Sequence, residues 1–157
     1  MGKIQKNENI TFTASLLLVL LFAYAAFSKL LERNVFTFQM QLAPVHLVND
    51  LAPFLSWFVP CIELVVVLLL CYERYRITGL YCSFFLLLFF NIYITAMLLS
   101  GLELPCTCGG IISHMGWKMH LLFNGGFMLV AVIPIVMQYK IKKHINPEYP
   151  ACPYEGI

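Results

Sequence analysis

Charged residues are scarce in this chain: they make up 11% of its 157 residues, whereas hydrophobic residues make up 61%. An ordinary soluble domain is about 25% charged, so this composition excludes that class and indicates a protein embedded in a membrane. The chain also lacks a polar stretch long enough for a soluble domain. It contains no internal repeat, no phosphate-binding loop and no nucleic-acid-binding motif, so we expect no nucleic-acid partner.

Long apolar runs are present instead, and four of them approach or exceed the roughly 18 to 20 residues that a helix needs to cross the hydrocarbon core. They predict helices over about residues 10–31, 54–73, 77–100 and 117–140. The expected fold is all-α, an integral membrane four-helix bundle over residues 1–145 with a proline-rich tail over 146–157. The first run resembles a signal peptide, but it stays apolar past the small residues where cleavage would fall, so we expect a retained helix.

Two connections between these runs are informative. Residues 34–50 mix apolar and polar side chains around Pro44, which predicts a short amphipathic helix or re-entrant cap at the membrane interface. The short basic stretch near Glu73 to Thr78 predicts a tight hairpin that makes the second and third helices antiparallel neighbours.

The lysines and arginines are unevenly divided between the two sides of such a bundle. One side receives seven of the ten, namely Lys3, Lys6, Arg74, Arg76, Lys140, Lys142 and Lys143. The other side receives Lys29, Arg33 and Lys118. The positive-inside rule therefore predicts that both termini are cytoplasmic and that the connection between the third and fourth helices faces an oxidising space outside.

That outer connection contains Cys106 and Cys108, separated by one residue and followed by Gly109 and Gly110. Two thiols at this spacing close a disulfide only where the backbone turns sharply, and paired glycines permit the turn. A disulfide in so small a ring is strained, and strained, exposed disulfides exchange readily with other thiols. The pair is a candidate redox site, with a purely structural disulfide as the alternative.

Metal ligation is a further alternative for the same connection. Cys106, Cys108, His114 and His120 would supply two thiolates and two imidazoles to zinc or copper(I), although their spacing matches no established zinc pattern. We favour a different role for His120: it falls about one turn into the fourth helix, where its imidazole would hold a nearby cysteine as thiolate.

The other four cysteines are weaker candidates for a reactive site. Cys61, Cys71 and Cys82 fall within or at the ends of predicted spans, where cysteine is usually a small buried hydrophobe. Cys152 is expected on the cytoplasmic side, out of reach of the outer pair, and its role is left open.

Glu63 is the carboxylate that falls inside a predicted span. A carboxylate at that depth is costly, so it is normally paired, protonated or part of a polar pathway. We expect Lys29 to be its partner, either as a strut between helices or as part of a proton-handling site. Asn91 and Asn124 are expected to donate interhelical hydrogen bonds. Trp117 is expected in an aromatic belt at the outer interface.

Three stretches also carry a family resemblance. They are Phe22-Ala23-Tyr24-Ala25-Ala26-Phe27-Ser28-Lys29-Leu30, Pro60-Cys61-Ile62-Glu63-Leu64, and Pro105-Cys106-Thr107-Cys108-Gly109 followed by Gly116-Trp117 and Asn124. Together, over about residues 10–139, they resemble the methylamine utilisation protein MauE family within the wider DoxX-like four-helix membrane proteins. The chain departs from the family where Cys108 leads directly into Gly109, without the aromatic residue often found there.

The resemblance implies a protein of the bacterial inner membrane, with the cysteine connection in the periplasm. It further implies disulfide formation or thiol delivery to a thioredoxin-like or otherwise cysteine-bearing partner, with a quinone as candidate cofactor. The candidate catalytic residues are Cys106, Cys108, His120 and Glu63, and the candidate supporting residues are Lys29, Trp117, Asn124, Gly109, Gly110 and His114. The alternatives are a non-enzymatic anchor or assembly subunit, and a copper(I) or zinc carrier.

Overall fold

The computed structural model describes residues 2–41, 46–99 and 117–145. Within these ranges every regular element is a helix and no strand is present. The four long helices are α1 (Gly2–Leu31), α4 (Ala52–Cys71), α5 (Arg76–Leu99) and α6 (Trp117–Ile145). Each contains an apolar stretch long enough to cross a membrane. These helices confirm the all-α, four-helix membrane fold expected from the sequence.

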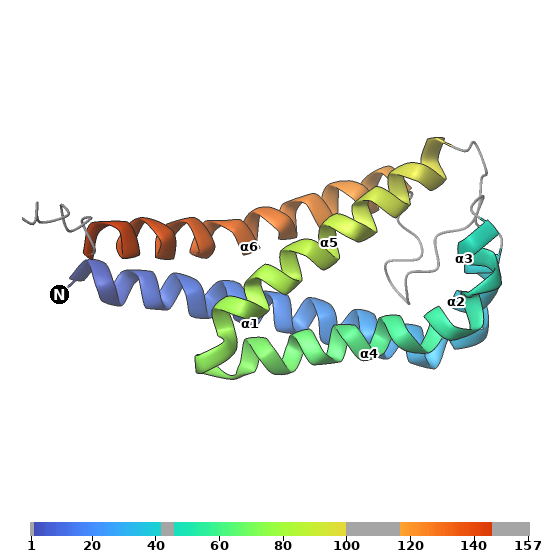
Figure 1. Cartoon of the computed structure of the whole chain (residues 1–157), viewed down its shortest axis with the longest axis horizontal. Coiled ribbons are helices and arrows are strands. Elements are labelled where there is room, and N and C mark those ends of the chain that lie inside the picture. The colour runs from blue at the N-terminus through green and yellow to red at the C-terminus, as the bar shows by residue number, and fades with distance from the viewer. Residues whose placement is uncertain (1, 42–45, 100–116, 146–157) are drawn as a thin grey trace, which may run out of the picture.

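The long helices associate as two pairs joined by a hairpin. α1 packs along α4 and α5 packs along α6, while α4 turns into α5 through the short 3-10 helix η1 (Glu73–Tyr75) (Figure 1). The first turns of α1 lie beside the last turns of α6 (Figure 1). The bundle therefore begins and ends at the same end of the molecule. The tight hairpin predicted near Glu73 to Thr78 is confirmed.

Gly79 explains how closely the two arms of this hairpin approach. A Cβ atom added at Gly79 would lie 3.0 Å from the backbone nitrogen of Leu70 and 3.1 Å from the backbone carbon of Leu69. Backbone atoms cannot swing aside as a side-chain tip can, so this close contact favours glycine over a larger residue.

Two short helices, α2 (Arg33–Gln41) and α3 (His46–Asp50), fill the connection between α1 and α4. Phe36 and Met40 of α2 are buried against Ala52 and Val59 of α4. Apolar residues on one face of α2 thereby hold it against the bundle, and the short helix predicted in this connection is confirmed.

The molecule has two ends that differ in content. We call the end with α2 and α3 the loop half, which comprises residues 23–41, 46–63, 88–99 and 117–129, and the opposite end the terminal half, which comprises residues 2–22, 64–87 and 130–145. The larger apolar core lies in the terminal half and is formed by Leu18, Phe22, Val66, Leu70, Leu80, Leu87 and Ala131.

Candidate functional site

Lys29 and Glu63 form a buried ion pair between α1 and α4. The Nζ atom of Lys29 donates a hydrogen bond to Oε1 of Glu63 at 2.5 Å. The two side chains are 7% and 0% exposed, so neither charge is reached by solvent or lipid head groups. The pairing expected from the sequence is confirmed, and it joins α1 and α4, the two helices with the most extensive contact among the described residues.

Aromatic rings complete the surroundings of the Lys29 ammonium. Its Nζ atom lies 5.1 Å from the ring centroid of Phe90 on α5 and 5.9 Å from that of Phe36 on α2. The electron-rich faces of aromatic rings attract cations, most strongly where water is excluded. Residues from α1, α2, α4 and α5 therefore meet at one ammonium group, inside an otherwise apolar environment.

The fourth long helix places two further polar side chains in the interior of the loop half. His120 and Asn124 are one turn apart on α6 and are 8% and 5% exposed. The Nδ1 atom of His120 has no hydrogen-bond partner within the described part of the chain. Buried polar atoms are nearly always satisfied, so an unpartnered imidazole nitrogen is a group available to a proton or a ligand.

Asn91 makes the interhelical contact that was expected of it. Its Nδ2 atom donates to the sulfur of Met128 at 3.0 Å, which connects α5 to α6. Its Oδ1 atom is buried and has no partner among the described residues. The corresponding contact expected of Asn124 remains a prediction.

The cysteine pair is connected to this polar region by the chain. Cys106, Cys108, Gly109, Gly110 and His114 lie outside the described residues, between the end of α5 at Leu99 and the start of α6 at Trp117. Cys152 lies outside them as well. His120 follows this segment by one turn of helix, so the segment begins and ends in the loop half.

Metal ligation by the four proposed ligands remains an alternative, because three of them, Cys106, Cys108 and His114, lie outside the described residues. Within residues 2–41, 46–99 and 117–145, no group of three or more histidine, cysteine or acidic side chains comes together. Of the four proposed ligands, His120 is the one that the structure describes.

The expectation for the other cysteines is wrong. Cys61 and Cys71 are exposed on the surface of the bundle, and Cys82 is half-buried, all three as free thiols. A membrane helix turns apolar side chains towards lipid as readily as towards its neighbours, so a small hydrophobe does not need the bundle interior.

Three contacts between a cation and an aromatic ring in the loop half were missed from the sequence. Besides the rings around Lys29, the guanidinium of Arg33 lies 4.9 Å from the ring of Trp57, which ties the start of α2 to α4. No periodic signal marks such contacts, because the chain has 13 phenylalanines and they recur along every apolar helix.

A comparison with protein families identifies the chain. A family model described as methylamine utilisation protein MauE matches residues 7–137, which is most of the sequence. The chain belongs to the MauE family. The matched range includes all of α4 and α5 and most of α1 and α6, together with the Lys29–Glu63 pair, Cys106, Cys108 and His120. Searches of curated proteins and of solved structures found no match. This MauE-family chain is a multi-pass membrane protein, as its four apolar helices require.

Proposed function

We propose that this membrane protein exchanges a disulfide with an extracytoplasmic partner, a thioredoxin-like or otherwise cysteine-bearing protein. The observation that carries the proposal is the buried Lys29–Glu63 pair, because a charged pair inside an apolar bundle is typical of proton-handling sites. It lies in the loop half, which also contains Leu99 and Trp117, the described residues on either side of the segment that bears Cys106 and Cys108. Methylamine utilisation, which the family description names, is the proposed physiological setting.

The proposed exchange proceeds in two balanced steps. A partner thiolate attacks one sulfur of the Cys106–Cys108 disulfide, so that a mixed disulfide forms and the other cysteine leaves as a thiolate. The second partner thiolate then attacks the mixed disulfide, which leaves an oxidised partner and a reduced cysteine pair. Two electrons and two protons have moved from the partner to Cys106 and Cys108.

The reduced pair must then be oxidised again. A lipid-soluble quinone is the proposed electron acceptor, and it takes up two electrons and two protons to become a hydroquinone. We regard it as a substrate that arrives through the membrane. Proton transfer is the part that the described residues suit. Glu63 and Lys29 form an acid–base couple, and Nδ1 of His120 has no partner among the described residues and lies one turn along the chain from the cysteine segment.

The proposed orientation has both termini in the cytoplasm and Cys106 and Cys108 in the periplasm of a bacterial inner membrane. Its support is the excess of lysine and arginine at the end of the bundle that carries the termini.

Single substitutions Cys106→Ser and Cys108→Ser test the proposal, with Cys61→Ser as the matched control because Cys61 is an exposed free thiol of the bundle surface. We expect one outer variant to accumulate a mixed disulfide with its partner, visible by non-reducing electrophoresis, while the control forms none. In intact spheroplasts, a membrane-impermeant maleimide should label the outer pair after mild reduction.

Three results would contradict the proposal. A pair that is reduced only when the protein unfolds, with no mixed disulfide in either variant, would support a structural disulfide in an anchor or assembly subunit. Stoichiometric copper or zinc that is lost in both cysteine variants would support a metal carrier. Labelling of Cys152 in place of the outer pair would reverse the orientation.

A further inference from the structure

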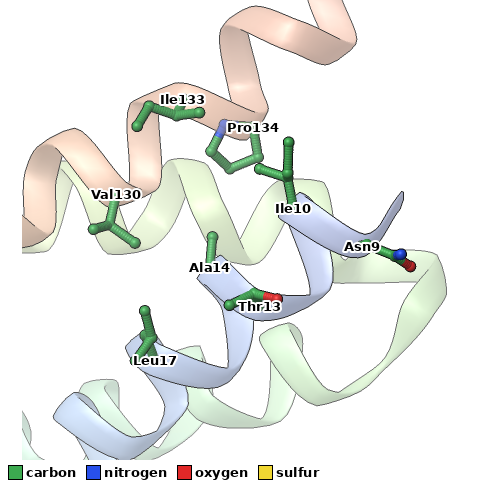
Figure 2. A pocket seen from close by; sticks show the side chains of 8 residues that line it. All are labelled: Asn9, Ile10, Thr13, Ala14, Leu17, Val130, Ile133 and Pro134. Carbon is green, nitrogen blue, oxygen red and sulfur yellow. The ribbon is translucent and has the colours of Figure 1, made fainter. Parts of the chain in front are cut away.

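An open groove lies between α1 and α6 in the terminal half, far along both helices from the cysteine segment. Its volume is about 350 Å³, within the range of roughly 300 to 1,000 Å³ that is usual for small-ligand sites. One wall is formed by α1 and the other by α6 (Figure 2). The lining residues are Asn9, Ile10, Thr13, Ala14 and Leu17 of α1 and Val130, Ile133 and Pro134 of α6.

The polarity of the lining changes along the groove. Asn9 and Thr13 lie towards the N-terminal end of α1, whereas Leu17 and Val130 lie further towards the middle of the bundle (Figure 2). From Asn9 to Leu17 the helix rises about 12 Å at 1.5 Å per residue. An open, mostly apolar groove of this length, with two polar side chains towards the N-terminal end of α1, matches the first part of the acyl chain of a phospholipid.

The charge at the terminal end of the groove favours one class of phospholipid. Arg74 and Lys140 are exposed at this end of the bundle, and Lys140 follows Pro134 by about 9 Å along α6. The same end receives seven of the ten basic residues of the chain, and among the described residues Glu8 and Glu73 are its carboxylates. Clusters of basic residues next to a membrane span attract anionic head groups.

We propose that this groove binds one acyl chain of an anionic phospholipid, with the head group held by the basic residues at the terminal end. The bound lipid fills the gap that the described residues leave between α1 and α6. This inference rests on the groove and its charge, and it does not depend on disulfide exchange.

Native mass spectrometry of the purified full-length protein tests it, with phosphatidylglycerol and phosphatidylcholine of identical acyl chains as probes. We expect one tightly held phosphatidylglycerol and weaker phosphatidylcholine. Leu17→Trp should fill the groove and weaken phosphatidylglycerol binding about tenfold, because several methylene groups lose their burial. Leu16→Trp is the matched control, since Leu16 is its exposed neighbour on α1 and lies outside the groove.

Two further variants make the result decisive. Thr13→Trp fills the groove from an exposed position and should reproduce the effect of Leu17→Trp if that variant does not fold. Lys140→Gln should reduce the preference for phosphatidylglycerol over phosphatidylcholine. Equal binding of the two lipids by the unaltered protein would overturn the head-group assignment. The site would be overturned if the Leu16, Leu17 and Thr13 variants bound phosphatidylglycerol equally well. It would also be overturned if the groove retained a quinone in place of phospholipid.

Discussion

Both halves of the bundle bond buried hydroxyls to their own helices, as Ser56 does in the loop half, and the loop half adds a charged pair between two helices. In the terminal half, the hydroxyls of Ser15 and Ser83 each donate at 2.8 Å to a carbonyl one turn earlier in the same helix, that of Thr11 and that of Gly79. In the loop half, Lys29 reaches Glu63 on another helix. Burying a hydroxyl that bonds to its own helix costs little free energy in lipid. A buried charge whose partner is on another helix loses that partner whenever the two helices separate.

Buried polar atoms without hydrogen-bond partners among the described residues occur in both halves, with Nε of Arg76 in the terminal half and others in the loop half. Nδ1 of His120 and Oδ1 of Asn91 are buried without hydrogen-bond partners in the described part of the chain. Packing alone would favour replacing such groups with apolar ones, as in the core around Leu18 and Phe22. The buried Lys29–Glu63 pair distinguishes the loop half from the terminal half, which contains the larger apolar core.

The largest expected effect comes from breaking the ion pair. Glu63→Leu or Lys29→Met should each lower the free energy of unfolding by about 3 to 5 kcal/mol, because each leaves one charge buried without its partner. Unfolding by denaturant in detergent micelles measures this loss. Glu73→Gln is the matched control: this carboxylate is 89% exposed in the hairpin, 3.8 Å from Arg76, and its removal should change stability by less than about 0.5 kcal/mol.

The double variant Lys29→Met, Glu63→Leu separates a strut from a proton-handling site. With both charges gone and apolar side chains in their place, we expect stability to return close to that of the unaltered protein. Disulfide exchange should nevertheless remain impaired. A double variant that is stable and fully active would show that the pair only fixes the packing of α1 on α4. The ion pair of the loop half would then have a structural role and no part in disulfide exchange.

The sequence predicted the helices and the ion pair for the same physical reason. Lipid offers no hydrogen-bond partner, so a span must be a long apolar helix and a carboxylate such as Glu63 must find a partner within it. The lipid environment also explains which features the sequence could not predict. Both faces of a membrane helix are apolar, so nothing in the sequence distinguished Phe90, which contacts Lys29, from other phenylalanines, or showed that Cys61 faces outwards. The lipid groove depends on the spacing of α1 and α6, which no local pattern encodes.

A medium effect is expected in the terminal half, where packing is closest. Gly79→Ala places a Cβ atom 3.0 Å from the backbone nitrogen of Leu70 and should cost about 1 to 3 kcal/mol, because the hairpin arms must move apart. Gly126→Ala is the control: a Cβ atom there meets nothing within 4 Å, and alanine's better helix propensity should leave stability equal or up to about 1 kcal/mol higher. Equal losses in both variants would mean that the hairpin is not specially close-packed.

The smallest effect is expected at Asn91. Asn91→Leu removes the hydrogen bond to the Met128 sulfur but also removes a buried oxygen without a partner, so the two consequences oppose each other. Interhelical side-chain hydrogen bonds in membranes contribute about 0.6 kcal/mol on average, and sulfur is a weak acceptor, so the net loss should stay below that value. Thr95→Val is the control, because its hydroxyl donates to the carbonyl of Asn91 within α5 and joins no other helix. A loss above about 2 kcal/mol at Asn91, measured by the same denaturant unfolding, would show that its amide has a further partner. The buried polar groups of the loop half would then make more hydrogen bonds between helices than the structure describes.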